Sequence, residues 1–228
     1  MSGRVSVVIP VLNAARTLPA CLAAVRCDST VELVLADGGS TDNSTEVAVQ
    51  NGARLVRGEP GRGGQLIRGA SVAAGEWLLF LHADTVLSSG WRGAVSRYAA
   101  DPANANRAGY FRFALDDPHP RARRIERLVA WRCRALGLPY GDQGLLIARA
   151  FYESLGGYRP LPLMEDVDLV RRIGRSRLRM IEATATTSAA RYRRDGWTLR
   201  PLRNLLCLSL YFAGVKPKAL LRFYAGRR

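Results

Sequence analysis

The stretch WLLFLHADTV, residues 77–86, decides the fold, because five apolar residues lead directly into a histidine and a carboxylate. A strand that is hydrophobic on both faces belongs in the middle of a parallel sheet. Ligands of open α/β sheets bind outside the carboxyl ends of such strands. His82 and Asp84 are therefore predicted to lie at the functional edge of an α/β fold.

The N-terminal part of the chain repeats this alternation of strand and helix. Between the apolar runs, apolar residues recur at three- and four-residue spacing, which is typical of helices. Gly52 and Gly75 are the predicted stops of the second and third helices. Parallel, right-handed winding is the default for such a series. The predicted strands are residues 5–11, 31–37, 53–58 and 77–83.

The second half is less regular, and it contains neither an internal repeat nor a low-complexity linker. Residues 108–115 and 144–149 are predicted strands, and residues 121–137 are a predicted amphipathic helix. Residues 165–175 form a helix with acids in the first turn and arginines in the last, which suits the helix dipole. We therefore expect one α/β domain, residues 1–195, and a C-terminal helical segment, residues 196–228.

The chain is strongly basic, with 34 lysines and arginines against 19 acids and a formal charge of +15. This balance favours contact with phosphates, nucleic acid or an anionic membrane, without choosing among them. Solvated surface arginines that bind no partner explain the positive charge equally well.

Cysteine and histidine usage excludes a structural zinc site, because the four cysteines form no C-x-x-C pair and the two histidines lie far apart in the sequence. A domain of this size needs no disulfides, and no secretory signal precedes the first strand. The expected compartment is the reducing cytoplasm.

Polar clusters follow the predicted strands. Pro10 and Asn13 follow the first strand, and Asp37 follows the second within DGGSTD. DGGSTD also suits a simple turn and helix cap. Arg62 lies among glycines at a helix start, which is typical of anion binding. No P-loop and no G-x-G-x-x-G fingerprint is present, which argues against an ATPase and a dehydrogenase.

The HADT cluster places a carboxylate after a buried strand. Mg²⁺ and Mn²⁺ take oxygen ligands and share substrate phosphates, so Asp84 suits such a cation. A turn cap is the alternative for a single aspartate in this position. The metal hypothesis depends on all the clusters meeting at one edge of one sheet.

Four stretches together resemble the family 2 glycosyltransferases, which have the GT-A fold: a Rossmann-like, mostly parallel central sheet flanked by helices. The spellings DGGSTD, LHADT, GDQG and PLMEDVDL resemble a compact bacterial subgroup that includes members linked to arsenosugar biosynthesis. The stretches, in order, are VSVVIPVLNAARTLPACL, ELVLADGGSTDNS, GRGGQLIRGASVAAGEWLLFLHADT and GDQGLLIARAFYESLGGYRPLPLMEDVDLVRRIGR.

The resemblance implies a nucleotide site and a metal ligand. Asp37 would bind the base or the ribose, with Pro10 and Asn13 in the same pocket and Arg62 and Ala83 beside it. The D-x-D motif of the family corresponds to HAD in this chain. Asp84 is therefore the expected ligand of Mg²⁺ or Mn²⁺, and His82 replaces the usual first aspartate.

The resemblance also implies the catalytic pair Glu165 and Asp166, with Asp166 as the base. A second departure from the family pattern is Ala14, where many relatives carry glutamate. Three residues before a predicted strand, Gly141, Asp142 and Gln143, are candidates for contact with the donor sugar or the acceptor. Arg191 either binds phosphate or lies on the surface.

The implied reaction is an inverting transfer of sugar from a nucleotide sugar, most simply a UDP sugar, to an acceptor hydroxyl. Such a transfer needs a base on the acceptor side and a cation on the leaving diphosphate. The acceptor, a lipid or a small molecule, and the donor sugar stay open. Two alternatives are a sugar-phosphate nucleotidyltransferase and a non-catalytic basic module; the former lacks a phosphate loop after the first strand, and the latter gives no reason for acids at strand ends. Nucleic acid is therefore not an expected partner.

The C-terminal stretch LLCLSLYFAGV, residues 205–215, is apolar and has basic flanks at Arg200, Arg203, Lys216, Lys218 and Arg222. It is too short to span a bilayer. Either it is a helix packed on the domain, or it lies in the interface of an anionic membrane. The second reading predicts peripheral attachment to the inner face of the cytoplasmic membrane.

Overall fold

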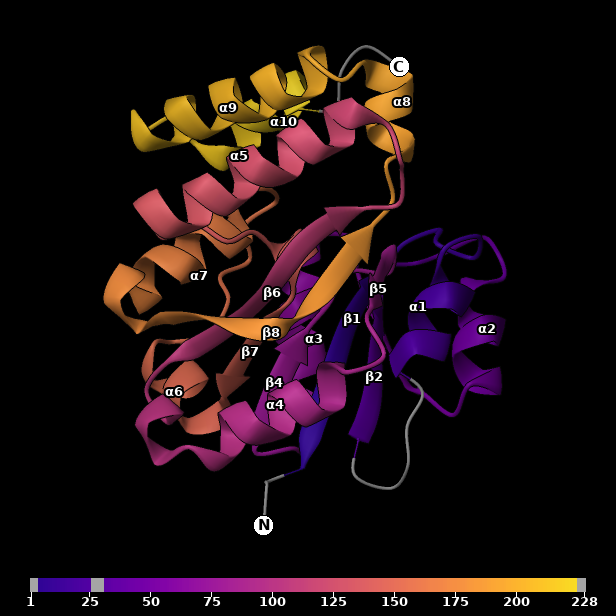
Figure 1. Ribbon diagram of the computed structural model, residues 1–228. Helices are drawn as coiled ribbons and strands as arrows, with labels where there is room; N and C mark the ends of the chain where they lie inside the picture. Colours follow the sequence, from indigo (N-terminus) through magenta and orange to yellow (C-terminus); the bar gives the residue numbers. More distant parts are fainter. Residues whose placement is uncertain (1–3, 26–30, 225–228) are drawn as a thin grey trace.

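The computed structural model describes residues 4–25 and 31–224. An eight-stranded sheet lies between two layers of helices (Figure 1), and its strand order is β3-β2-β1-β4-β7-β6-β8-β5. This confirms the predicted α/β fold. The strands are β1 (Val5–Val11), β2 (Val31–Asp37), β3 (Arg54–Arg57), β4 (Trp77–Phe80), β5 (Thr85–Leu87), β6 (Ala108–Leu115), β7 (Leu145–Ala148) and β8 (Leu178–Thr187).

Ten α-helices occur in the described residues, and short 3₁₀ turns join some of the elements. The helices are α1 (Leu18–Val25), α2 (Ser44–Gln50), α3 (Arg62–Val72), α4 (Trp91–Ala100), α5 (Pro120–Leu136), α6 (Arg149–Ser154), α7 (Glu165–Ile173), α8 (Ala190–Asp195), α9 (Leu199–Phe212) and α10 (Pro217–Tyr224).

The pairing of the strands explains why polar residues gather at one edge. The strands β3, β2, β1 and β4 pair in parallel, as predicted for the first half of the chain. β7 runs antiparallel to both β4 and β6, and β8 runs parallel to β6. Because β7 is reversed, the loop that precedes it lies at the same edge as the loops that follow β1, β2, β4 and β8.

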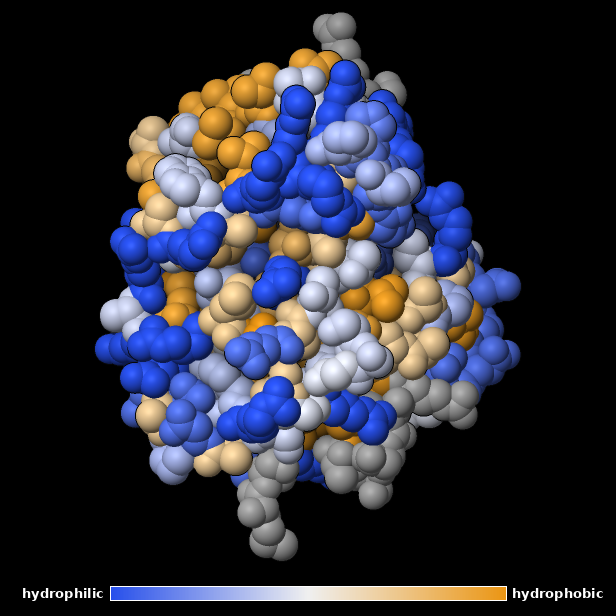
Figure 2. Space-filling view, viewed as in Figure 1, coloured by the Kyte–Doolittle hydropathy of each residue, from blue (hydrophilic) through white to orange (hydrophobic). Residues whose placement is uncertain are grey.

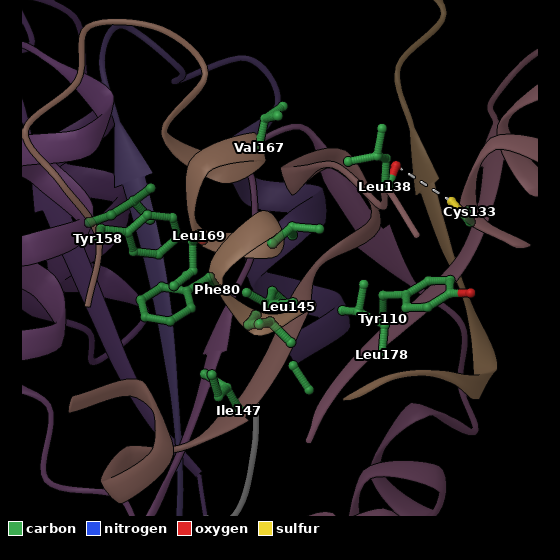
Figure 3. Close-up of a cluster of buried hydrophobic side chains, with 14 of the residues drawn as sticks. Phe80, Tyr110, Cys133, Leu138, Leu145, Ile147, Tyr158, Val167, Leu169 and Leu178 are labelled. Atoms are coloured by element: carbon green, nitrogen blue, oxygen red, sulfur yellow. Dashed lines mark hydrogen bonds between the residues drawn. The ribbon is translucent and has the colours of Figure 1, made fainter. Parts of the chain in front are cut away.

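Strict alternation along the strands divides the core between the two faces of the sheet. Val8, Val34 and Leu78 pack with residues of α3, α5 and α7 on one face, whereas Val7 and Leu79 pack with residues of α1 and α4 on the other. Figure 3 shows part of the first cluster, where Phe80 of β4 meets Tyr158 and Leu169 lies beside it. Two buried faces on one strand account for the continuous apolar run that the sequence carries.

Some predicted boundaries and elements were wrong. The helix α3 ends at Val72 and not at Gly75. Gly75 instead allows close packing, because a Cβ there would lie 2.6 Å from the carbonyl oxygen of Arg4. β4 ends at Phe80, three residues before the predicted end, although the Leu81 N–H still donates to the Val8 carbonyl.

Two strands were missed. The three-residue strand β5 is too short to show a period, and the threonine-rich β8 has no apolar run. Both lie at the end of the sheet, where β5 pairs with β8 in an antiparallel ladder. β8 matters for the site because it delivers Thr187 and the residues after it to the functional edge.

The C-terminal helices pack on the α5 and α7 side of the sheet (Figure 1). Cys207, Leu208 and Leu220 are buried in the same cluster as the residues of α5 and α7. Cys21, Cys133 and Cys207 are free and buried, and Cys27 lies outside the described residues. Of the helices described, none has the length and the hydropathy that crossing a bilayer requires.

Candidate active site

Two adjoining hollows open at the functional edge. The larger one, here called the outer cleft, has a volume of about 840 Å³, and the smaller one, the inner pocket, about 120 Å³. Pro10, Asn13 and Ala83 line the outer cleft, whereas Asp142 and Asp166 line the inner pocket. The residues that line both hollows are Arg62, His82, Asp84, Leu163, Glu165, Ser188 and Arg191.

The loop after β1 forms one wall of the outer cleft and is joined to the loop after β2 by side-chain hydrogen bonds. The backbone N–H of Asn13 donates to Ser40 Oγ over 3.0 Å, and the N–H of Thr41 donates to Asn13 Oδ1 over 2.8 Å. Asn13 itself has a φ of 51°. Left-handed backbone is tolerated by asparagine more readily than by most residues, so the sequence suits this bend.

Asp37 lies behind this wall and does not line either hollow. It is 2% exposed, and its carboxylate accepts the N–H groups of Gly39 and Ser40 at 3.1 Å. Its observed contacts are therefore those of a loop cap. A direct contact between Asp37 and a nucleotide stays a prediction.

Arg62, in the first turn of α3, joins the two sides of the site. Its Nε lies 3.3 Å from Glu165 Oε1, and an NH2 nitrogen lies 2.7 Å from His82 Nδ1. The adjacent Gly63 lets the helix approach the segment before α7, because a Cβ there would lie 2.4 Å from the carbonyl oxygen of Arg159. The glycines of this loop thus serve packing as well as any anion contact.

His82 carries a neutral ring. Burial lowers its pKa well below the ordinary value, and the positive charges of Arg62 and Arg191 add to this effect. A neutral imidazole accepts a hydrogen bond from Arg62 and brings no negative charge to the site. The residue at the first position of the HAD motif therefore orients Arg62 and leaves Asp84 as the carboxylate of that motif.

Asp166 and Gly141 tie the beginning of α7 to the loop before β7. Asp166 Oδ2 accepts the N–H of Gly141 over 2.9 Å, and Asp166 Oδ1 accepts the N–H of Val167 over 2.8 Å. Glycine at position 141 lets the loop pass close to the His82 ring, because a Cβ would lie 2.4 Å from His82 Nε2 and 3.4 Å from Asp166 Oδ2. Met164, the residue directly before α7, has a φ of 66°. Strained backbone of this kind concentrates at functional sites.

Glu165 is 2% exposed and sits on the boundary between the two hollows. Burial and, after it, the neighbouring Asp166 carboxylate raise its pKa to about 7 against the opposing effect of Arg62. Near neutral pH this carboxyl group therefore passes between a neutral form and an ion paired with Arg62.

Asp84 and Asp142 are the pair that would hold a divalent cation. Asp84 Oδ1 accepts from Thr187 Oγ1 over 3.4 Å, and Asp142 Oδ1 is buried without a hydrogen-bond partner among the described residues. Burial raises the pKa of Asp142 to about 6, and the Asp166 and Asp84 carboxylates contribute. An unpartnered oxygen beside a second carboxylate fits a cation that neutralises both.

No three histidine, cysteine or acidic side chains cluster as a complete metal cage in the described part of the chain. Mg²⁺ and related ions are commonly bound by one or two carboxylates together with substrate phosphates, so a full cage is not needed. The residues present therefore fit a cation shared with a diphosphate.

The structure places the remaining candidates differently from one another. Arg191, at the start of α8, lines both hollows. Gln143 lines neither, because it is 2% exposed and its Nε2 donates to the Phe111 carbonyl over 3.2 Å. Gly141 contributes through the close contacts described above.

Sequence reasoning missed several residues that shape the site. Gln65 Nε2 donates to the Val11 and Ala36 carbonyls over 2.7 and 2.9 Å, which joins the carboxyl ends of β1 and β2. A glutamine in a glycine-rich helix start was the available signal. The inner pocket is also lined by Thr187, Arg200 and Asn204. Thr187 belongs to β8, and Arg200 and Asn204 belong to α9. The sequence alone does not indicate that these two elements reach the site.

Comparison with known proteins agrees with this geometry. A protein of Mycobacterium bovis described as a PGL/p-HBAD biosynthesis glycosyltransferase is 42% identical over 91 residues, which are 36% of this chain and 36% of that protein. The chain thus matches only about a third of the length of this relative.

Two solved structures share the fold. A mannosyltransferase of Pyrobaculum calidifontis, in complex with GDP-Man and Mn²⁺, has a TM-score of 0.64 at 19% identity and covers 89% of this chain and 60% of its own. Glucosyl-3-phosphoglycerate synthase of Mycobacterium tuberculosis, in complex with Mn²⁺, UDP and glucosyl-3-phosphoglycerate, has a TM-score of 0.57 at 20% identity over 82% of this chain and 70% of its own.

The family model described as glycosyl transferase family 2 matches residues 6–151, which is more than half of the chain. That range contains most of β1, the strands β2 and β4, the loops after β1 and β4 that line part of the outer cleft, and the loop before β7. With its GT-A arrangement of strands and its two adjoining hollows, the chain belongs to glycosyl transferase family 2.

Proposed function

We propose that the protein is an inverting glycosyltransferase that moves a sugar from a nucleotide diphosphate sugar, a UDP sugar in the simplest case, to an acceptor hydroxyl. One observation carries this proposal. Arg62 and Asp84 lie on the wall between the outer cleft and the inner pocket, and Asp166 lies in the inner pocket beyond them. Inversion requires the leaving group and the base on opposite sides of the sugar, and this arrangement provides separate places for them.

In this proposal the outer cleft binds the nucleotide. Pro10, Asn13 and Ala83 line it, and its volume of about 840 Å³ suits a ligand of that size. Arg62 and Arg191 supply positive charge toward the diphosphate. The solved complexes with GDP-Man and with UDP, each with Mn²⁺, support a nucleotide and a cation here.

Asp84 and Asp142 would hold Mg²⁺ or Mn²⁺. When bound, the cation would neutralise charge that develops on the leaving diphosphate. Asp142 is otherwise a costly buried acid, since its Oδ1 has no partner among the described residues. Arg62 acts on the same charge, and the neutral ring of His82 together with Glu165 keeps the guanidinium in place.

Asp166 would take the proton of the acceptor hydroxyl. A general base must lie within hydrogen-bond reach of the proton that it removes. Both carboxylate oxygens of Asp166 accept backbone N–H groups, which fixes the orientation of the side chain in the inner pocket. The remaining lone pairs are available to an acceptor hydroxyl.

The sugar-phosphate nucleotidyltransferase alternative has less support, because the family match covers the nucleotide half and no phosphate loop follows β1. The cytoplasmic location and a peripheral contact with an anionic membrane stay predictions.

Calorimetry with UDP and with GDP tests the nucleotide and metal parts of the proposal. We expect binding of a nucleotide diphosphate in the presence of Mn²⁺ and a large loss of affinity in EDTA. Asp84→Asn should weaken the Mn²⁺-dependent binding by about 10-fold to 100-fold, because one charged ligand is lost.

Asp101→Asn is the matched control, since Asp101 caps a 3₁₀ turn outside both hollows and should bind nucleotide like the wild type. Equal affinity with and without the metal would remove the cation from the proposal. Absence of binding to either nucleotide would remove the donor site.

A further inference from the structure

The helix α9 turns a wholly uncharged face to solvent. Leu199, Leu202, Leu205 and Leu206 are each between 53% and 65% exposed, and Phe212 is 46% exposed. These positions, with Ser209 and Ala213, recur at three- and four-residue spacing, so they share one side of the helix. The outer face of a surface helix is normally polar. This face therefore calls for a partner.

A basic face of α5 borders this apolar surface. Trp131 and Leu128 are 57% and 61% exposed. The segments that precede α5 and α9 meet where the ring of His119 stacks on Trp197, with the ring centroids 5.5 Å apart. In Figure 2 hydrophobic side chains cover the top of the molecule over α9, and hydrophilic side chains lie directly beside them. The exposed arginines on α5 are Arg121, Arg123, Arg124, Arg127 and Arg134.

The charge on α5, α9 and α10 is almost entirely positive. The sequences of α9 and α10 contain no acidic residue, and Lys216 and Lys218 follow α9 on exposed positions. The one acid of α5, Glu126, pairs with Arg123 at 2.8 Å. Exposed leucines and a tryptophan flanked by exposed arginines and lysines match the composition of helices that lie in a membrane interface.

We propose that the exposed faces of α9 and α5, here called the docking surface, bind an anionic lipid bilayer and hold the inner pocket at the membrane. An amphipathic helix inserts its apolar face into the boundary between headgroups and acyl chains, and nearby basic residues add attraction to anionic lipid. A second copy of the chain explains the leucines but not the arginines, since basic faces repel each other.

The opposite side of α9 connects this surface to the site. Arg200, Asn204 and Leu208 line the inner pocket, and Asn204 Oδ1 is buried without a partner in the part of the chain that the structure describes. A helix with its side chains is about 10–12 Å across, so the inner pocket lies about one helix thickness from the bound bilayer. The inference thus deepens the proposed function, on which this last step rests, by placing its acceptor side at the membrane.

Vesicle co-sedimentation of the full chain tests the docking surface. We expect the protein to pellet with vesicles of equal parts phosphatidylcholine and phosphatidylglycerol, and less with phosphatidylcholine alone. Changing Leu202, Leu205 and Leu206 together to glutamine should reduce partitioning by about tenfold or more, because three apolar side chains leave the interface. Arg124→Gln with Arg127→Gln should reduce it several-fold and flatten its dependence on salt.

A matched control changes Val49 and Met180 to glutamine, which are 64% and 52% exposed on α2 and β8 and lie away from the docking surface. This variant should pellet like the wild type. Quenching by brominated lipid provides a local readout in a Trp197→Phe background: it should act on Trp131 and be largely lost when Trp131 is also changed to Phe, since Trp77 and Trp91 are buried.

The outcomes separate this inference from the proposed function. A wild-type protein that binds nucleotide but fails to pellet at low salt overturns the docking surface and leaves the proposed function standing. Pelleting that the leucine variant retains in full also overturns it. Dimerisation in sedimentation velocity that the leucine variant abolishes, without vesicle binding, would assign the face to a second copy. Vesicle binding without any nucleotide binding would retain the surface and reject the proposed function.

Discussion

The outer cleft and the inner pocket are built in different ways. More than half of the residues that line the outer cleft lie within the first 84 residues, mostly in loops that follow parallel strands, and the others come from segments between Pro162 and Leu221. The inner pocket draws on the loop before the reversed strand β7, the start of α7, the end of β8 and the inner side of α9. The outer cleft is thus built mainly from repeated local units, whereas the inner pocket is assembled from distant segments.

This difference explains how the two hollows divide chemical work. Parallel strands end at one edge by construction, so a shared nucleotide site needs only polar residues in successive loops. The acceptor side needs elements from outside this series of strand-and-helix units. Such elements can vary without disturbing the sheet. Residues on the wall between the hollows, above all Arg62, belong to both.

The largest effect is expected from Asp166→Asn, which separates the two hollows functionally. The substitution keeps the size of the side chain but removes the base, so transfer should fall by a factor on the order of 10² to 10⁴. Nucleotide affinity should stay close to wild type, because Asp166 does not line the outer cleft. Steady-state transfer rates and nucleotide calorimetry measure the two effects. A folded variant with wild-type turnover would show that another group is the base.

A smaller effect is expected from Gly141→Ala, which disturbs the inner pocket through packing alone. The added Cβ would lie 2.4 Å from His82 Nε2, so the loop before β7 or the His82 ring must move. Displacement of this order lowers transfer by about 10-fold to 100-fold. Nucleotide affinity should change much less than the rate.

Gly93→Ala is the matched control, because the nearest atom to a Cβ there is the flexible end of Arg97 at 3.4 Å. In the first turn of α4 this substitution should stabilise the protein by about 0.4–1 kcal/mol and leave transfer unchanged. If Gly141→Ala instead weakened nucleotide binding as strongly as transfer, the two hollows would be one coupled site.

The smallest effect concerns Glu165, on the boundary between the hollows. Its pKa in the folded protein is raised to about 7 from an ordinary 4.5, so the folded state binds a proton that the unfolded chain has released. This contribution to stability is full below the unfolded pKa and disappears as pH rises through about 7. The free energy of unfolding of Glu165→Gln should therefore fall by about 1–3 kcal/mol less than that of the wild type when the pH rises from about 5 to about 8.

Urea unfolding at several pH values gives this comparison. Asp142, with its pKa raised to about 6, makes the free energy of unfolding fall with rising pH in both the wild type and the variant. Only the difference between the two proteins therefore reports on Glu165. Parallel curves for variant and wild type would mean that Arg62 holds Glu165 ionised throughout.

The sequence alone determined six of the eight strands, the parallel order of the first four and the edge at which the chemistry lies. These follow from local patterns, since apolar strands, helical spacing and strand-end polar clusters each occupy a few consecutive residues. The family resemblance added residues 141–143 and 165–166, which periodicity would not have assigned to a site.

Only the tertiary structure decided how the candidates work together. It showed Asp37 as a buried loop cap, Gln143 as a core hydrogen-bonding residue and His82 as a neutral partner of Arg62. It also brought Thr187 and α9 to the inner pocket and left the leucines of α9 exposed. The physical reason is that a contact between distant segments depends on the direction of β7 and on the packing of helices over the sheet, which no local stretch of the chain encodes.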